Sequence, residues 1–103
     1  MSGFALHPEA LADLEEIWAF IADDSLEAAD RILDEIRQVM HSLVAFPRMG
    51  HMRADLSSRP LRFHPVRDFL IAYAPDEKPL VVIAVLHGGR NPRVISAPLR
   101  ERD

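Results

Sequence analysis

The chain has 103 residues, 49% of them hydrophobic, which suffices for one core but not two, so we predict a single domain over residues 1–103. It contains no cysteine, which excludes a disulfide framework, a thiolate nucleophile and a zinc site built on sulfur. No apolar run approaches the roughly 20 residues that cross a bilayer, and the first residues do not form a secretory signal, so we expect a cytoplasmic protein.

The net charge of −4 conceals two halves of opposite sign. Residues 1–46 carry ten acidic residues against two arginines, whereas residues 47–103 carry ten basic residues against six acidic ones. Eleven of the twelve basic residues are arginine, whose planar guanidinium binds carboxylates and phosphates through paired hydrogen bonds. We therefore expect a binding surface in the second half, with an ordinary solvated surface as the alternative for any single arginine.

The chain should begin with a short strand that leads directly into a helix. Residues 3–7 partly alternate in polarity, and Pro8 suits the first position of a helix. From Pro8 to about Asp23, apolar residues recur at the three-and-four spacing of an amphipathic helix. Trp18 lies on that apolar stripe, so we expect it in the core.

A second amphipathic helix should follow almost at once. Ser25 is a suitable N-cap for it, and Phe46-Pro47 should end it. So short a break between the two helices predicts a helical hairpin. We expect its acidic side chains to be solvated, which argues against an enzyme built on paired carboxylates; they include Asp13, Glu15, Glu16, Asp34 and Glu35.

Beyond the helices the periodicity becomes that of strands. Residues 61–64 alternate between apolar and polar, which predicts a half-buried strand, and a turn should follow at residues 65–68. Residues 69–73 and 80–86 are nearly continuous apolar runs, and the connection at residues 75–79 is short enough for an antiparallel hairpin.

These elements predict an α+β fold, in which an N-terminal strand and a helical hairpin accompany a small antiparallel sheet with a C-terminal three-stranded meander. The hairpin can cover one face of the sheet, yet the last two strands are apolar on both. The second face should therefore be partly bare and covered by a partner or a second copy of the chain. The alternative is that residues 48–58 and the C-terminal tail fold back over it.

Five short motifs follow one another along the chain. They are Ala10-x-x-Asp13-Leu14-x-x-Ile17-Trp18, Ala28-Ala29, Phe46-Pro47-x-Met49-Gly50-x-x-Arg53-x-Asp55-Leu56, Phe69-Leu70-Ile71-x-Tyr73 and Val85-Leu86-His87-Gly88-x-Arg90-Asn91-Pro92. No single motif is specific, but their order and spacing resemble ParE-type toxins of the RelE/ParE superfamily. The resemblance implies the toxin of a type II toxin–antitoxin (plasmid stabilisation) system, held inactive by a ParD-like antitoxin and inhibiting DNA gyrase by binding.

A RelE-type, ribosome-dependent mRNA endoribonuclease is the first alternative. Its reaction needs a base for the ribose 2′-hydroxyl, an acid for the leaving oxygen and cations for the charge on phosphorus. The only lysine, Lys78, falls in a predicted turn, and the only tyrosine, Tyr73, falls inside a predicted strand. This leaves His87 and Arg90 as the one credible acid–base and phosphate-binding pair. A relative that has lost toxicity and serves as a regulatory or structural partner is the second alternative.

The candidate site consists of arginines that we expect at one end of the sheet. Arg67, before the third strand, and Arg90, after the fourth, should be neighbours, because both lie opposite the 75–79 connection in an antiparallel hairpin. We predict no catalytic residue. The residues predicted to bind the target are Arg90, Arg93, His87 and Arg67, and those predicted to bind the antitoxin are Arg48, Arg53, Leu61, Phe63 and Tyr73.

Other partners and cofactors find little support in the sequence. The five histidines do not show metal-ligand spacing on one element, so we predict no metal site and no other cofactor. We expect no membrane contact and no direct sequence-specific binding of nucleic acid. A homodimer is possible when the antitoxin is absent.

Overall fold

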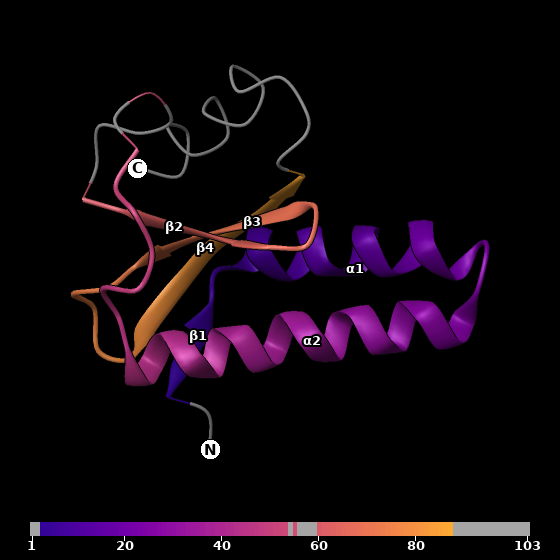
Figure 1. Cartoon of the computed structure of the whole chain (residues 1–103), viewed down its shortest axis with the longest axis horizontal. Helices are drawn as coiled ribbons and strands as arrows, with labels where there is room; N and C mark the ends of the chain where they lie inside the picture. The colour runs from indigo at the N-terminus through magenta and orange to yellow at the C-terminus, as the bar shows by residue number, and fades with distance from the viewer. Residues whose placement is uncertain (1–2, 54, 56–59, 88–103) are drawn as a thin grey trace.

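The computed structural model describes residues 3–53, 55 and 60–87. Six elements follow one another in the chain (Figure 1), namely β1 (Phe4–Leu6), α1 (Pro8–Ala22), α2 (Leu26–Ala45), β2 (Arg62–Val66), β3 (Phe69–Ala74) and β4 (Leu80–His87). They confirm the α+β fold with a helical hairpin and a three-stranded meander. Among the described helices, none is long and apolar enough to cross a membrane.

Local chemistry sets the bounds of the helices. Pro8 stands in the first turn of α1, and the preceding His7 caps this helix by accepting a hydrogen bond from the amide of Glu9 at 3.1 Å. Ser25 caps α2, as predicted, by accepting one from the amide of Ala28 at 3.2 Å. The caps therefore fix where each helix begins, and Pro47, two residues past the end of α2, cannot continue that helix.

The sheet has the strand order β1-β4-β3-β2. We predicted an antiparallel sheet, but the observed sheet is mixed. The meander β2-β3-β4 is antiparallel, but β1 pairs in parallel with β4, Phe4 opposite Leu80 and Leu6 opposite Val82. The helical hairpin of α1 and α2 explains why β4 runs parallel to β1. It returns the chain to the end where β1 starts, so that a Cβ on Gly3 would lie 2.7 Å from Val44 of α2. The meander begins at that end, and its third strand therefore runs parallel to β1.

The predicted turn at residues 65–68 is shorter in the structure. Pro65 belongs to β2, and only Arg67 and Asp68 separate Val66 from its partner Phe69. A proline is tolerated there because β2 is the edge strand of the sheet. Arg67 has a φ of 54°, the left-handed conformation that two-residue hairpin turns require.

The sheet is buried on both faces. The face toward the helices packs against Ala10 of α1 and against α2, whereas the opposite face forms a second cluster. The exposed fractions in that second cluster are 2% for Leu61, 2% for Phe63 and 6% for Ile83, with Ala72 and Ala84 at 0%. The expectation of a partly bare face was wrong for these residues, because a single copy of the chain already removes them from water.

Candidate functional site

The predicted arginine cluster is divided between the two ends of the sheet. At one end, His87 closes β4 opposite Phe69, and their rings meet edge to face with centroids 5.5 Å apart. Arg67 occupies the turn beside this pair. Its Nε donates a 2.7 Å hydrogen bond to Glu35 Oε2 of α2, so the turn is tied to the helical layer. His87 is exposed, and both predicted target-binding residues in the described part of the chain lie at this end.

Arg90 and Arg93 lie outside the described residues, and so does the expected proximity of Arg67 and Arg90. The pairing of Phe69 with His87 does place the start of β3 beside the end of β4, as the predicted hairpin required.

Arg48 lies at the opposite end of the sheet, which corrects the expectation of a single cluster. Its guanidinium is 3.7 Å from the carboxylate of Asp76, which lies in the β3–β4 connection. Both side chains are more than two thirds exposed, so the pair contributes little to stability. The reason for this placement is the helical hairpin, which delivers the chain after α2 to the end of the sheet where β4 starts.

The side chain of Arg53 pairs with Asp55, two residues later in the chain. Its Nε and Nη2 donate hydrogen bonds of 2.9 and 2.7 Å to the two carboxylate oxygens of Asp55. This hydrogen bonding lowers the pKa of Asp55. Two residues before Arg53, His51 forms an antiparallel bridge with Phe63 of β2. Arg53 therefore lies just beyond the edge of the sheet at β2, and its guanidinium is already paired with Asp55.

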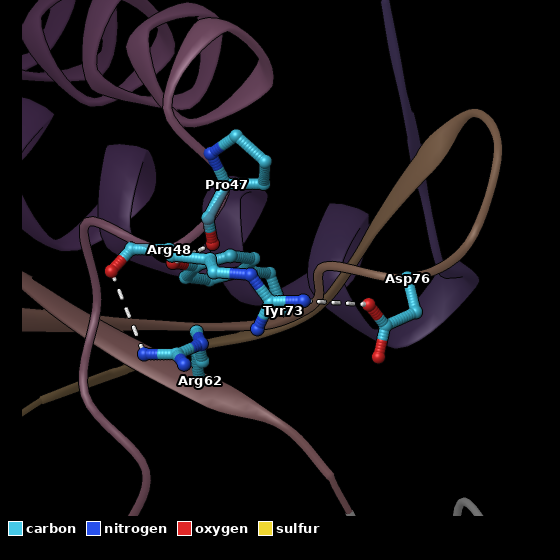
Figure 2. Close-up of polar contacts among 5 residues, drawn as sticks. All are labelled: Pro47, Arg48, Arg62, Tyr73 and Asp76. Atoms are coloured by element: carbon cyan, nitrogen blue, oxygen red, sulfur yellow. Dashed lines mark hydrogen bonds and ion pairs between the residues drawn. The ribbon is translucent and has the colours of Figure 1, made fainter.

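The turn after α2 is fastened to the sheet by Tyr73 (Figure 2). The Tyr73 hydroxyl donates to the carbonyl of Pro47 at 2.8 Å and accepts from the amide of Gly50 at 2.9 Å. Arg62 Nη1 donates to the carbonyl of Gly50 at 2.7 Å, with Arg48 O at 3.5 Å. Burial raises the pKa of the Tyr73 phenol. We name Tyr73, Arg62, Pro47 and Gly50 the loop anchor.

Gly50 is required at this point because there is no room for a side chain. A Cβ there would lie 2.6 Å from the Tyr73 hydroxyl and 2.9 Å from the carbonyl oxygen of Phe63. No role was predicted for Arg62 or Gly50. The available signal was the Phe46-Pro47-x-Met49-Gly50 motif, which puts a helix-ending proline and a glycine within one turn.

Three residues predicted to bind the antitoxin lie in the core. Tyr73 has an exposed fraction of 0%, and Leu61 and Phe63 are each at 2%. Their side chains offer almost no surface to a partner. The alternation of residues 61–64 predicted a half-buried strand, and in the structure Leu61 and Phe63 belong to the buried cluster on the sheet face opposite the helices.

An open groove of about 730 Å³ lies between α1, α2 and β1. Trp18 was expected in the core, but it lines this groove with 38% of its surface exposed, and Leu11 is 50% exposed. Trp18 Nε1 donates to Asp30 Oδ1 at 2.9 Å, which satisfies the indole while leaving its ring accessible. Charged residues from both helices line the same groove, and they are Glu15, Asp30, Arg31, Asp34 and Arg37.

Arg31 and Arg37 differ from the other described arginines. Arg48, Arg53 and Arg67 have acidic partners, and Arg62 binds backbone carbonyls. Within residues 3–53, 55 and 60–87, Arg31 and Arg37 have no acidic group within 4.0 Å. Over the same residues, no three histidine or acidic side chains are grouped so that they could hold a metal ion. The groove thus combines exposed apolar side chains with charged ones of both signs, and its two arginines are not engaged by acidic groups of the described residues.

Comparison with known proteins identifies the class. A family model described as the ParE toxin of the type II toxin–antitoxin system parDE matches residues 4–92. The match includes every element in the described part of the chain, from β1 to β4. The chain belongs to the ParE toxin family.

A particular relative supports the same assignment. The chain is 32% identical to Toxin ParE3 of Caulobacter vibrioides over 81 residues, which covers 77% of this chain and 79% of that protein. The resemblance drawn from the five motifs is therefore confirmed at the level of the family.

Proposed function

We propose that the chain is the toxin of a type II toxin–antitoxin pair, that a ParD-like antitoxin neutralises it, and that the free toxin acts in the cytoplasm by binding and inhibiting DNA gyrase. The observation that carries this proposal is the match to the ParE toxin family over residues 4–92. Gyrase inhibition and antitoxin binding are the functions that the resemblance to this family implied.

The placement of Tyr73 supports binding rather than RNA cleavage. The chain has one tyrosine, and it is fully buried with its hydroxyl bonded to two backbone groups. Its pKa is raised by burial, so it is poorly suited to exchange protons with a substrate. The one lysine, Lys78, lies in the β3–β4 connection, at the opposite end of β4 from His87.

For the antitoxin, the groove between the helices is the better candidate than the buried sheet residues. Its exposed apolar side chains, Leu11 and Trp18, are typical of surfaces that receive an amphipathic helix. Arg31 and Arg37, at the same groove, would pair with acidic side chains of the antitoxin. Arg48 and Arg53 would then contact the next segment of the antitoxin, beyond the part that lies in the groove.

For the target, we propose His87 and Arg67 together with Arg90 and Arg93. His87 and Arg67 share one end of the sheet, which leaves the antitoxin groove and the target surface on different elements. Arg67 already pairs with Glu35 at a half-exposed site, so it can exchange this partner for an acidic group of the target at small cost.

Controlled expression in a bacterial host tests the function. Growth, the DNA-damage response and messenger RNA integrity should be scored in one culture, and supercoiling by purified gyrase should be assayed with the purified chain. We expect growth arrest with DNA damage, intact transcripts and inhibited supercoiling. Fragmented transcripts would contradict gyrase inhibition and indicate a RelE-type ribonuclease instead. Normal growth with soluble protein would indicate a relative without toxicity.

Fluorescence tests antitoxin docking, because Trp18 is the only tryptophan. Titration with a ParD-like antitoxin should shift the Trp18 emission to shorter wavelength as the groove loses water. Arg37→Ala should weaken this binding, whereas Arg67→Ala, at the other site, should not. An unchanged emission during complete binding would place the antitoxin elsewhere.

A further inference from the structure

Asp13 was expected to be a solvated helix residue, but it joins α1 to the sheet. Its side chain is half-buried, and Oδ2 accepts a hydrogen bond from the backbone amide of Val85 at 3.0 Å. The acceptor is 72 residues away in sequence from the donor. The contact is thus a long-range tie between the first helix and the last strand.

The position of Val85 explains why a side chain is needed there. β1 pairs with β4 only as far as Leu6 opposite Val82, and the amide of His7 then donates to the Val82 carbonyl at 2.9 Å. After that point the chain leaves the sheet to begin α1. Within residues 3–53, 55 and 60–87, β1 therefore offers no acceptor to the amide of Val85, and the Asp13 carboxylate supplies the one that a longer β1 would have provided.

The register of the sheet makes this part of β4 a distinct segment. Ala72 pairs with Ala84 and Tyr73 with Val82, so Ile83 is an additional residue in β4. Such bulges redirect the strand that contains them. Asp13 binds just after the bulge, and His87 follows two residues later. On its other side, the same stretch pairs with β3 through Ile71 to Val85 and Phe69 to His87.

We propose that Asp13 is a positioning residue for the target-binding end of β4: by holding the Val85 amide, it sets the direction in which β4 leaves its bulge and so fixes the placement of His87. This inference rests on the proposed function for its biological consequence. Its structural part, the dependence of residues 85–87 on Asp13, stands without it.

The electrostatics agree with a tie that is partly shielded from water. Burial raises the pKa of the Asp13 carboxyl, the hydrogen bond from Val85 opposes this change, and the nearby Glu16 adds to it. A group placed only for solubility would not be kept half-buried against its preference for water.

The test compares Asp13→Ala, which removes the acceptor, with Asp13→Asn, whose amide oxygen can still accept from Val85. Glu16→Ala, one turn further along α1, is the matched control. Amide hydrogen exchange is measured at residues 85–87. In Asp13→Ala we expect exchange about 10-fold faster there, with little change in β3, and near-normal exchange in Asp13→Asn and Glu16→Ala.

The same variants are then expressed for growth inhibition. Asp13→Ala should lose toxicity about 10-fold at equal soluble protein, with recovery in Asp13→Asn. Unchanged exchange at Val85 in Asp13→Ala would overturn the inference, and so would equal loss of toxicity in the Ala and Asn variants. If Asp13→Ala does not fold, the NMR chemical shift of the Val85 amide provides the test. In the original chain this shift should change with pH as Asp13 ionises, and in Asp13→Asn that change should be absent.

A failure of the proposed function is distinguishable from a failure of this inference. If the original chain is not toxic, the growth measurement is silent for every variant, but the exchange and resonance measurements still confirm or refute the role of Asp13 in the placement of residues 85–87.

Discussion

Replacing Tyr73 by phenylalanine would remove one oxygen atom from the centre of the loop anchor. The ring would still fill its site, so the change isolates the two hydrogen bonds to Pro47 O and Gly50 N. Gly50 is buried, and its amide would lose the only acceptor that the described residues offer it. A buried donor left unpaired costs about 1–3 kcal/mol, and the Pro47 carbonyl, which water can partly reach, adds about 0.5 kcal/mol or more.

We therefore expect Tyr73→Phe to lower the free energy of unfolding by about 2–3 kcal/mol, or the melting temperature by at least about 8 °C for a domain of this size. Urea unfolding followed by circular dichroism measures it. The matched control is Ser42→Ala, which removes a hydroxyl that bonds the Gln38 carbonyl on the exposed side of α2 and should cost under about 0.5 kcal/mol. A loss in Tyr73→Phe no larger than in this control would refute the reasoning, because the turn would then not depend on the hydroxyl.

Three further predictions concern other parts of the molecule. Gly50→Ala should destabilise by about 1–3 kcal/mol because its Cβ meets Tyr73 and the Phe63 backbone, and in a double-mutant cycle it should cost less once Tyr73 is phenylalanine; strictly additive losses would contradict this. Burial, and then the nearby His51, lower the pKa of His64, so His64 favours its neutral form in the folded chain. Stability should therefore fall as pH drops below about 6.5, and His64→Gln should reduce that fall in thermal melts; an equal fall in the variant would contradict this. Arg90→Ala should weaken growth inhibition more than folding, and equal losses of soluble protein and toxicity would remove Arg90 from the target surface.

The sequence was sufficient for features that depend on local chemistry. Pro8 and Ser25 mark the helix starts because a missing amide hydrogen and a capping hydroxyl act within one turn. Strand periodicity placed β3 and β4 within a residue of their observed bounds. The order of the motifs then identified the family, since the relative positions of helices and strands are what members share.

Features that depend on distant parts of the chain could not be predicted in this way. The split of the arginines between two ends of the sheet follows from where the helical hairpin returns the chain, and no local pattern contains that information. Asp13 looks like any acidic residue of an amphipathic helix until β4 is placed beside it. Trp18 lies on the apolar stripe, but the stripe is wider than the surface the sheet can cover, so its edge opens onto the groove.

The parallel pairing of β1 with β4 has a consequence for folding of the chain during its synthesis on the ribosome. Phe4 has its sheet partner at Leu80, far later in the chain, and the strand between β1 and β3 is the last of the six elements in the described residues. The helices can form early, but the core beneath them cannot close until β4 has emerged. A growing chain therefore cannot complete this sheet before residues 80–87 have been synthesised, and a truncated chain that stops before Leu80 never completes it.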